Sequence, residues 1–245
     1  WCSLYSSILK VIVWFPFSND LTPFLKESKE PLIIFDVGCY VGNFSRTIKK
    51  KLVNKKIEFY LFDPNPKLKI KDFSYNNIAL SNKKGNFDYH LNTFFPSSGS
   101  SLKTFVKDDK LWNFTRKIVT LSLFKAFETF KVKVDLLDNY CNEKRITKID
   151  LLKIDVEGSE IDVLEGSSNI LKNTNVILIE IFDKKGEYEK KMNKIKSMLL
   201  ALNFELKKIK TTWSSQQMSN TKSADALFVK RNISSLWKLK KITIY

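Results

Sequence analysis

The sequence has 245 residues, of which 43% are hydrophobic and 13% aromatic, so it suits one globular α/β domain and is not typical of a disordered chain. Its formal net charge of +16 suggests a polyanionic partner, but only four of its 42 basic residues are arginine, which phosphate and base recognition favour. The excess of lysine is therefore better explained by a general bias in amino-acid composition than by selection for binding nucleic acid. We expect that nucleic acid is not the partner.

The cysteines and the single histidine form no metal-binding pattern. Cys2, Cys39 and Cys141 are widely spaced, and none lies at a ligand spacing from His90. This favours a reduced, cytoplasmic protein without a metal site.

Residues 1–30 are expected to form a helical extension, and residues 31–245 the main domain. The apolar stretch 4–17 is interrupted by Lys10 and is too short for a comfortable membrane span. A helix packed on the domain is the simplest interpretation, and the remnant of a signal or an interfacial anchor is the alternative. No firm membrane association is expected.

Apolar runs and helical patterns alternate along the main domain. Strands are predicted over 31–36, 57–66, 73–82 with a continuation through a turn to 91, 148–158 and 175–182. Helices are predicted over 42–53, 159–171 and 187–204, and the segment 132–141 leads into another. The segments 205–210 and 224–231 have the pattern of a terminal hairpin. Because the strands are apolar throughout, we expect a mainly parallel sheet covered on both faces.

Residues 92–131 interrupt this alternation. They contain the loop PSSGSS (96–101) and then mixed aromatic and basic sequence. We interpret this region as an insertion or lid that sets the choice of acceptor.

Four acids follow or end the predicted strands: Asp36, Asp63, Asp155 and Glu180. Ligands of parallel sheets bind at the carboxyl ends of the strands. We therefore expect these acids to gather along one edge of the sheet and to line a ligand site.

The turn after the first strand has the pattern D-x-G-x-x-x-G, with Gly38 and Gly42 as its glycines. Glycines and a helix N-terminus let backbone approach a ligand closely. A carboxylate at Asp36 repels a pyrophosphate, and Tyr40 stands where the dinucleotide pattern needs its second glycine. A nicotinamide-dependent oxidoreductase is thus disfavoured, and a sulfonium cofactor with an amino group fits better. Asp63, after the second strand, can accept hydrogen bonds from ribose hydroxyls.

With these motifs in order, the sequence resembles the FkbM-type S-adenosylmethionine-dependent methyltransferases. The segments that carry the resemblance are FDVGCYVGNFS (35–45), FDPNP (62–66), NIALSNKKG (77–85), SSL (100–102), VDLLDNY (134–140), IDLLKIDVEGSEIDVLEG (149–166) and ILIEI (177–181). The resemblance implies a Rossmann-like seven-stranded α/β sheet, mainly parallel with an antiparallel terminal hairpin and helices on both faces. It also implies S-adenosylmethionine as cofactor and methyl transfer, usually to a hydroxyl on a sugar or secondary metabolite.

The resemblance also implies roles for residues at matching positions. The methionine side of the cofactor would be lined by Asp36, Gly38 and Gly42, and Tyr40, Asn43 and Phe44 of the same segment would also bind the cofactor. Asp63 would hold the ribose, and adenine would be bordered by Asn77, Ile78 and Ala79. Tyr40 and Asp63 depart from the Asn and Glu that are usual in the family.

The transfer site would be faced by Asp155, Glu157 and Lys153. An alcohol acceptor benefits from a base within hydrogen-bond reach, and Asp155 or Glu157 is the candidate. Two alternatives stay open: Asp155 binds the cofactor amine, and Glu157 caps the following helix. Glu180 either reaches the site or is a strand-end acid beside a loop.

The expected partner is a small-molecule or glycan acceptor. The rival hypothesis is a catalytically silent basic module that binds RNA or anionic polysaccharide. The lysine-rich composition favours it, whereas the scarce arginines and the complete set of strand-end acids disfavour it.

Overall fold

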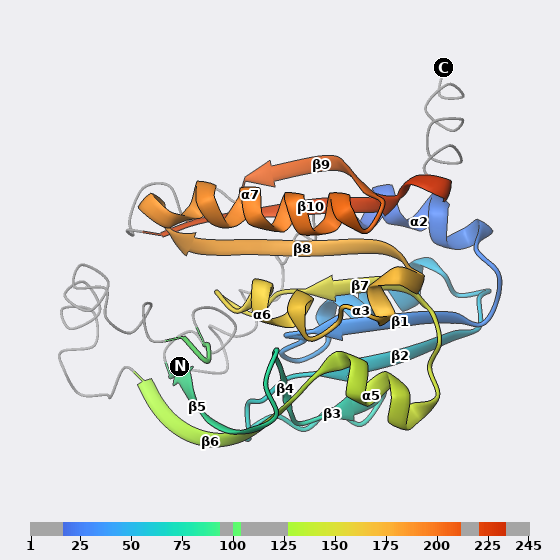
Figure 1. Ribbon diagram of the computed structural model, residues 1–245. Coiled ribbons are helices and arrows are strands. Elements are labelled where there is room, and N and C mark those ends of the chain that lie inside the picture. Colours follow the sequence, from blue (N-terminus) through green and yellow to red (C-terminus); the bar gives the residue numbers. More distant parts are fainter. Residues whose placement is uncertain (1–16, 94–99, 104–126, 212–220, 234–245) are drawn as a thin grey trace.

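The computed structural model describes residues 17–93, 100–103, 127–211 and 221–233 (Figure 1). The apolar stretch 4–17 lies outside them except for its last residue, and so does most of the predicted insertion. The division into an N-terminal extension and a main domain stays a prediction. None of the helices described is both long and apolar enough to span a bilayer.

A seven-stranded sheet forms the centre of the molecule, in the order β3-β2-β1-β7-β8-β10-β9. Its strands are β1 (Leu32–Val37), β2 (Ile57–Phe62), β3 (Ser74–Asn76), β7 (Ile149–Ile154), β8 (Thr174–Lys184), β9 (Phe204–Thr211) and β10 (Thr221–Lys230). The first five pair in parallel, whereas β10 lies antiparallel between β8 and β9. The predicted α/β sheet with an antiparallel terminal hairpin is confirmed.

Helices cover both faces of this sheet, which is why β1 and β7 are buried along their whole length (Figure 1). On one face, α2 (Ser18–Glu27) and α3 (Asn43–Lys51) bury Leu21, Leu25, Phe44 and Ile48 against side chains of β1, β2 and β7. The other face is covered by α5 (Leu137–Lys144), α6 (Glu160–Glu165) and α7 (Lys185–Ala201).

The predicted third strand, 73–82, is two short strands in two different sheets. β3 extends the main sheet, whereas β4 (Ala79–Leu80) pairs with β6 (Phe127–Asp135) in a three-stranded sheet of order β4-β6-β5. In that sheet β5 (Gly85–Asn92) pairs antiparallel with β6 along its whole length. Residues 127–131, assigned to the insertion from the sequence, therefore belong to a regular strand.

The predicted helix 159–171 is also wrong in length, because α6 ends at Glu165 and a 3₁₀ turn, η1 (Ile170–Asn173), follows. Gly166 separates the two. A Cβ at this position would lie 2.0 Å from the carbonyl oxygen of Ser81. The close approach of these two backbones places the end of α6 against the loop after β4.

Replacing Gly166 or Gly186 by alanine is expected to change the stability of the protein in opposite directions. G166A is expected to lower the free energy of unfolding by about 3 kcal/mol, because the added methyl group meets backbone that cannot move aside easily. A Cβ added to Gly186, in α7, would have no atom within 4 Å, so G186A is the matched control and is expected to stabilise by about 0.5 kcal/mol. Urea unfolding measures both, and equal stabilities would contradict the close approach.

Candidate active site at the carboxyl edge of the sheet

A row of charged side chains crosses the sheet near the carboxyl ends of its parallel strands. Asp36 is in register with Lys153, Glu180 with Asp225, and Asp225 with Lys210. Asp155 follows β7 and continues its register toward Glu180, since Ile154 and Ile179 are paired. We call this set the polar row: Asp36, Lys153, Asp155, Glu180, Asp225 and Lys210.

All members of the polar row lie on one face of the sheet. Side chains alternate between faces along a strand, and Leu151, Leu178 and Leu227 are two residues from row members. These three leucines are buried in the core beneath α2 and α3. The polar row thus continues the α3 face of the sheet, beyond the point where apolar packing ends.

Lys153 is the buried centre of the row, with only 7% of its surface exposed. Its Nζ lies 3.2 Å from Asp36 Oδ1 and 3.1 Å from Asp155 Oδ2, and it donates a hydrogen bond to the carbonyl oxygen of Gly38 at 3.3 Å. Burial by itself lowers the pKa of Lys153, but Asp155 and Asp36 raise it above its ordinary value. The ammonium therefore stays charged and compensates two acids.

Asp36 is fully buried, and both of its carboxylate oxygens contact protein groups. Its Oδ2 accepts a hydrogen bond of 2.7 Å from the Ser45 hydroxyl on α3. Its Oδ1 has no hydrogen bond of good geometry but faces the Lys153 ammonium. With both oxygens directed to protein groups, Asp36 links β1, α3 and β7.

The turn after β1 is held against its neighbours by backbone contacts. The N–H groups of Gly38 and Cys39 donate to the carbonyl oxygen of Phe62, and the N–H of Asp155 donates to that of Val37. A Cβ on Gly38 would lie 1.7 Å from the Asp155 carbonyl oxygen, and Gly38 has φ of 75°. Only glycine allows this approach.

Asp63 closes the same turn from the end of β2. Its Oδ2 accepts from the Tyr40 N–H at 2.8 Å, and its Oδ1 accepts from the Asn65 N–H at 2.9 Å. Burial raises the pKa of Asp63 to about 6, against the effect of these two hydrogen bonds. Tyr40 adopts a left-handed conformation with φ of 47°, which the Asp63 carboxylate helps to hold.

The residues expected beside adenine occupy different surroundings. The Asn77 side-chain amide donates to the carbonyl oxygens of Asp63 and Asn65, both at 2.9 Å, and so fixes the loop after β2. Ile78 packs at the edge of the core, whereas Ala79 is buried in the small sheet. A role in binding adenine stays a prediction for all three.

Three acids in the middle of the polar row, Asp155, Glu180 and Asp225, influence one another, and Glu157 lies near them. Burial and the carboxylates of Asp155, Glu157 and Asp225 raise the pKa of Glu180 well above its usual value, and Glu180 shares a hydrogen bond with Asp155. Burial and Asp155 raise the pKa of Asp225 to about 7, although Lys153 and Lys210 oppose this. The Asp155 side chain is 32% exposed, so the group opens to solvent there.

Glu157 is brought to these acids by an unusual backbone. It has φ of 51°, and Gly158 after it has φ of 110°. The structure therefore gathers the predicted residues Asp36, Lys153, Asp155, Glu157 and Glu180 at one edge, with Gly38, Gly42, Asn43 and Phe44 in the adjoining turn and the first turn of α3.

Sequence reasoning missed two residues at this edge. Asp225 lies on an antiparallel strand, and the rule that ligands bind at the carboxyl ends of parallel strands does not apply to it. A charged residue alone in the apolar run ADALFV could still have indicated a functional position. Tyr89, on β5, is buried; its pKa is raised first by burial and then by Asp63, with a further effect of Glu157. The small sheet thus contributes a side chain near both Asp63 and Glu157.

Two surface hollows lie elsewhere, beside α2 and the end of α3. One is lined by Asn19, Thr22, Pro23, Lys26, Glu27 and Lys51. The other is lined by Lys49, Leu52, Val53, Lys55, Ile57, Phe59, Asp72 and Phe73. Neither includes a member of the polar row, so they are not part of the candidate site. Within the described residues, no group of three or more His, Cys, Asp and Glu is arranged to hold a metal ion.

Most of this chain matches a known protein family. Residues 36–206 match the family described as the methyltransferase FkbM domain. This chain belongs to the FkbM methyltransferase family. The match begins at Asp36 of the polar row and includes every predicted site residue.

Two proteins that are similar to this chain have names that state the acceptor of the methyl group, an oxygen atom in one and a hexuronic acid in the other. The chain is 27% identical over 175 residues to the 2-O-methyltransferase NoeI of Sinorhizobium fredii, covering 65% of this chain and 66% of that protein. It is 25% identical over 162 residues to the hexuronic acid methyltransferase AglP of Haloferax volcanii, covering 64% of this chain and 59% of that protein. The chain therefore spans less than two thirds of the length of these relatives.

A solved structure, methyltransferase FkbM from Methylobacillus flagellatus KT, aligns with a TM-score of 0.46 at 9% identity. The alignment covers 81% of this chain and 43% of that one.

The donor set of this FkbM family member suits S-adenosylmethionine chemically. Carboxylates attract a cation and accept hydrogen bonds from hydroxyls, and the ionised oxygens of Asp63 and Asp155 are of this kind. The turn between β1 and α3 adds backbone donors at the start of a nine-residue helix. Lys153, the buried cation of this edge, is neutralised by Asp36 and Asp155 and so does not repel a positively charged ligand strongly.

The Lys153 ion pairs predict a large effect of one substitution. K153M leaves Asp36 buried without a counter-charge and is expected to lower the free energy of unfolding by about 3–5 kcal/mol. The control is K131M, because Lys131 pairs with Asp88 at the surface, where both side chains are more than half exposed. K131M is expected to leave urea unfolding unchanged, and a K153M protein as stable as K131M would contradict the assigned role of Lys153.

Proposed function

We propose that this protein transfers a methyl group from S-adenosylmethionine to a hydroxyl group of a sugar-containing acceptor. The observation that carries the proposal is that Asp155 and Glu180 of the polar row gather with Glu157 at a place where the Asp155 side chain reaches solvent. Membership of the FkbM family supports methyl transfer. The names of the two relatives, one a 2-O-methyltransferase and one a hexuronic acid methyltransferase, support oxygen of a sugar as the acceptor atom.

Three parts of the edge would hold the cofactor. The first turn of α3 would offer backbone donors to the methionine carboxylate, Asp63 would accept from the ribose hydroxyls, and Asp155 would lie on the side of the transferred group. The cofactor supplies an electrophilic methyl group on a sulfonium. Fixed acids beside that position attract the positive charge and orient an acceptor hydroxyl for in-line attack.

Asp155 is the proposed acceptor of the hydroxyl proton. It receives hydrogen bonds from the Lys153 ammonium at 3.1 Å and from Glu180. Burial and the neighbouring carboxylates raise the pKa of Glu180, which favours its protonated form as the donor of the hydrogen bond that it shares with Asp155. The proton of the acceptor hydroxyl would pass to Asp155 as the methyl group moves from sulfur to that oxygen, so that the carbon–sulfur bond breaks and the neutral thioether S-adenosylhomocysteine leaves.

D155N separates this role from binding of the cofactor amine. If Asp155 is the base, D155N is expected to keep cofactor affinity within about threefold while turnover falls by about 100-fold or more. The measurements are isothermal titration with S-adenosylmethionine and mass spectrometry of monosaccharides and hexuronic acids incubated with labelled cofactor. A large loss of affinity would instead assign Asp155 to the amine.

Cofactor affinity is also expected to depend on pH through Asp63. With a pKa of about 6, Asp63 is mostly protonated at pH 5 and mostly ionised at pH 7. Both oxygens of Asp63 already accept a backbone hydrogen bond, and the ionised carboxylate keeps a further lone pair on each of them for ribose, whereas protonation removes one acceptor position. Affinity should therefore rise about tenfold across this interval and then level off. In D63N the rise should be absent, and an equal rise in both proteins would exclude Asp63 as its source.

The silent basic module is tested by the same titrations. It predicts no heat with S-adenosylmethionine and strongly salt-dependent binding of RNA or anionic polysaccharide. That result would replace the methyltransferase proposal.

A further inference from the structure

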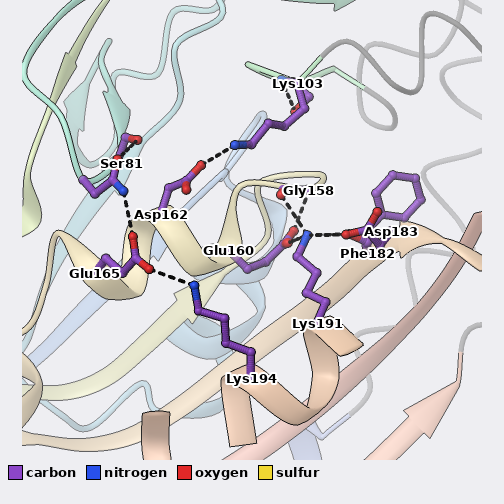
Figure 2. A network of polar contacts seen from close by, with 12 residues as sticks. Ser81, Lys103, Gly158, Glu160, Asp162, Glu165, Phe182, Asp183, Lys191 and Lys194 are labelled. Atoms are coloured by element: carbon purple, nitrogen blue, oxygen red, sulfur yellow. Dashed lines mark hydrogen bonds and ion pairs between the residues drawn. The ribbon is translucent and has the colours of Figure 1, made fainter. Parts of the chain in front are cut away.

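The short helix α6 is attached to surrounding segments by ion pairs along its length (Figure 2). Each joins a lysine to an acid of the helix: Lys191 to Glu160, Lys103 to Asp162, and Lys194 to Glu165. The Lys191 pair differs from the other two because it is buried, with the Glu160 side chain 0% exposed and that of Lys191 7%. The Lys194 pair lies on the surface, with its side chains 53% and 37% exposed.

Lys191 reaches from α7 into the loop that precedes α6. Its Nζ lies 2.6 Å from Glu160 Oε2 and donates to the carbonyl oxygen of Gly158 at 2.8 Å. The other carboxylate oxygen of Glu160, Oε1, accepts from the Gly158 N–H at 2.7 Å. Lys191 and Glu160 together therefore bind both polar groups of the Gly158 backbone.

This arrangement holds the backbone at Glu157. The Gly158 N–H belongs to the peptide that joins it to Glu157, so fixing it fixes ψ of Glu157. Glu157 lies in the left-handed region, which side-chain-bearing residues adopt only when their surroundings impose it. Loss of the Gly158 contacts would release the loop to a more ordinary conformation.

The same ammonium also binds the segment after Glu180. Lys191 Nζ donates to the carbonyl oxygen of Phe182 at 2.8 Å and lies 3.3 Å from Asp183 Oδ2 (Figure 2). One buried charge thus joins the end of β8, two residues beyond Glu180, to the loop that presents Glu157.

We infer that Lys191 and Glu160 are positioning residues that hold Glu157 and Glu180 at a fixed separation beside the transfer position. This inference rests on the proposed function. Stability alone does not require the pair, because replacing a buried ion pair by apolar side chains of similar size is often neutral or stabilising. The backbone contacts of Gly158, by contrast, need a charged or strongly polar partner.

The test compares K191M/E160M with the wild type and with K194M. The double variant is used because K191M alone leaves Glu160 buried and unpaired, which can prevent folding. K194M removes a lysine one turn further along α7 whose partner lies at the surface. The first measurement is amide hydrogen exchange, which does not depend on methyl transfer.

The expected result is at least tenfold faster exchange at Gly158 in K191M/E160M, with unchanged exchange in the turn at residues 36–44 and a melting temperature near that of the wild type. K194M should exchange like the wild type. Unchanged exchange at Gly158 in the folded double variant would overturn the inference. So would an equal increase throughout the chain, because it would report a loss of global stability and not of local positioning.

The second measurement uses two cofactor analogues. Sinefungin carries an amine-bearing carbon in place of the methylated sulfur, whereas S-adenosylhomocysteine keeps the sulfur but has neither the methyl group nor the positive charge. Their affinity ratio reports how well the acids are placed at the transfer position. We expect K191M/E160M to reduce this ratio at least fivefold while S-adenosylhomocysteine binds as before, and an unchanged ratio would overturn the inference. If neither analogue binds the wild type, the proposed function fails, while the exchange measurement still decides whether the loop is held.

Discussion

The candidate site depends on one buried ammonium group. Lys153 contacts Asp36 of β1, Asp155 after β7 and the carbonyl oxygen of Gly38, so it joins the two central strands of the sheet at their carboxyl ends. Without this charge, Asp36 would be buried without a counter-charge and Asp155 would face Glu180 without this compensation. The acids can gather at this edge because a lysine in the middle strand compensates them.

The sheet separates its two tasks by face. On the α5–α7 face, apolar packing continues to the strand ends, and the helices there hold loops such as that of Glu157. On the α3 face, apolar packing stops and the polar row begins. On this face, one strand places a buried leucine in the core and, two residues away, a charged residue in the polar row. The same strand therefore contributes to the core and to the site.

The sequence predicted most of the sheet and the position of the strand-end acids because apolar strands and glycine turns follow local rules. It failed where contacts between distant segments decide the outcome. The third strand divides because Ala79 pairs with Val134, and α6 stops because Gly166 meets the Ser81 backbone. Asp225 joins the acids through the antiparallel register of β10, and although its isolation in an apolar run marks it as unusual, that pattern does not show which residues it faces.

The position of β10 has a consequence for how the protein is made. This strand follows every other strand of the sheet in the chain, yet it inserts between β8 and β9, both of which precede it. Until β10 emerges from the ribosome, the edge of β8 has no β10 partner, and Glu180 and Asp155 are without the neighbouring Asp225. A nascent chain that has already formed β1, β2, β7 and β8 thus still exposes an open strand edge, so premature release would yield an aggregation-prone fragment without a complete site.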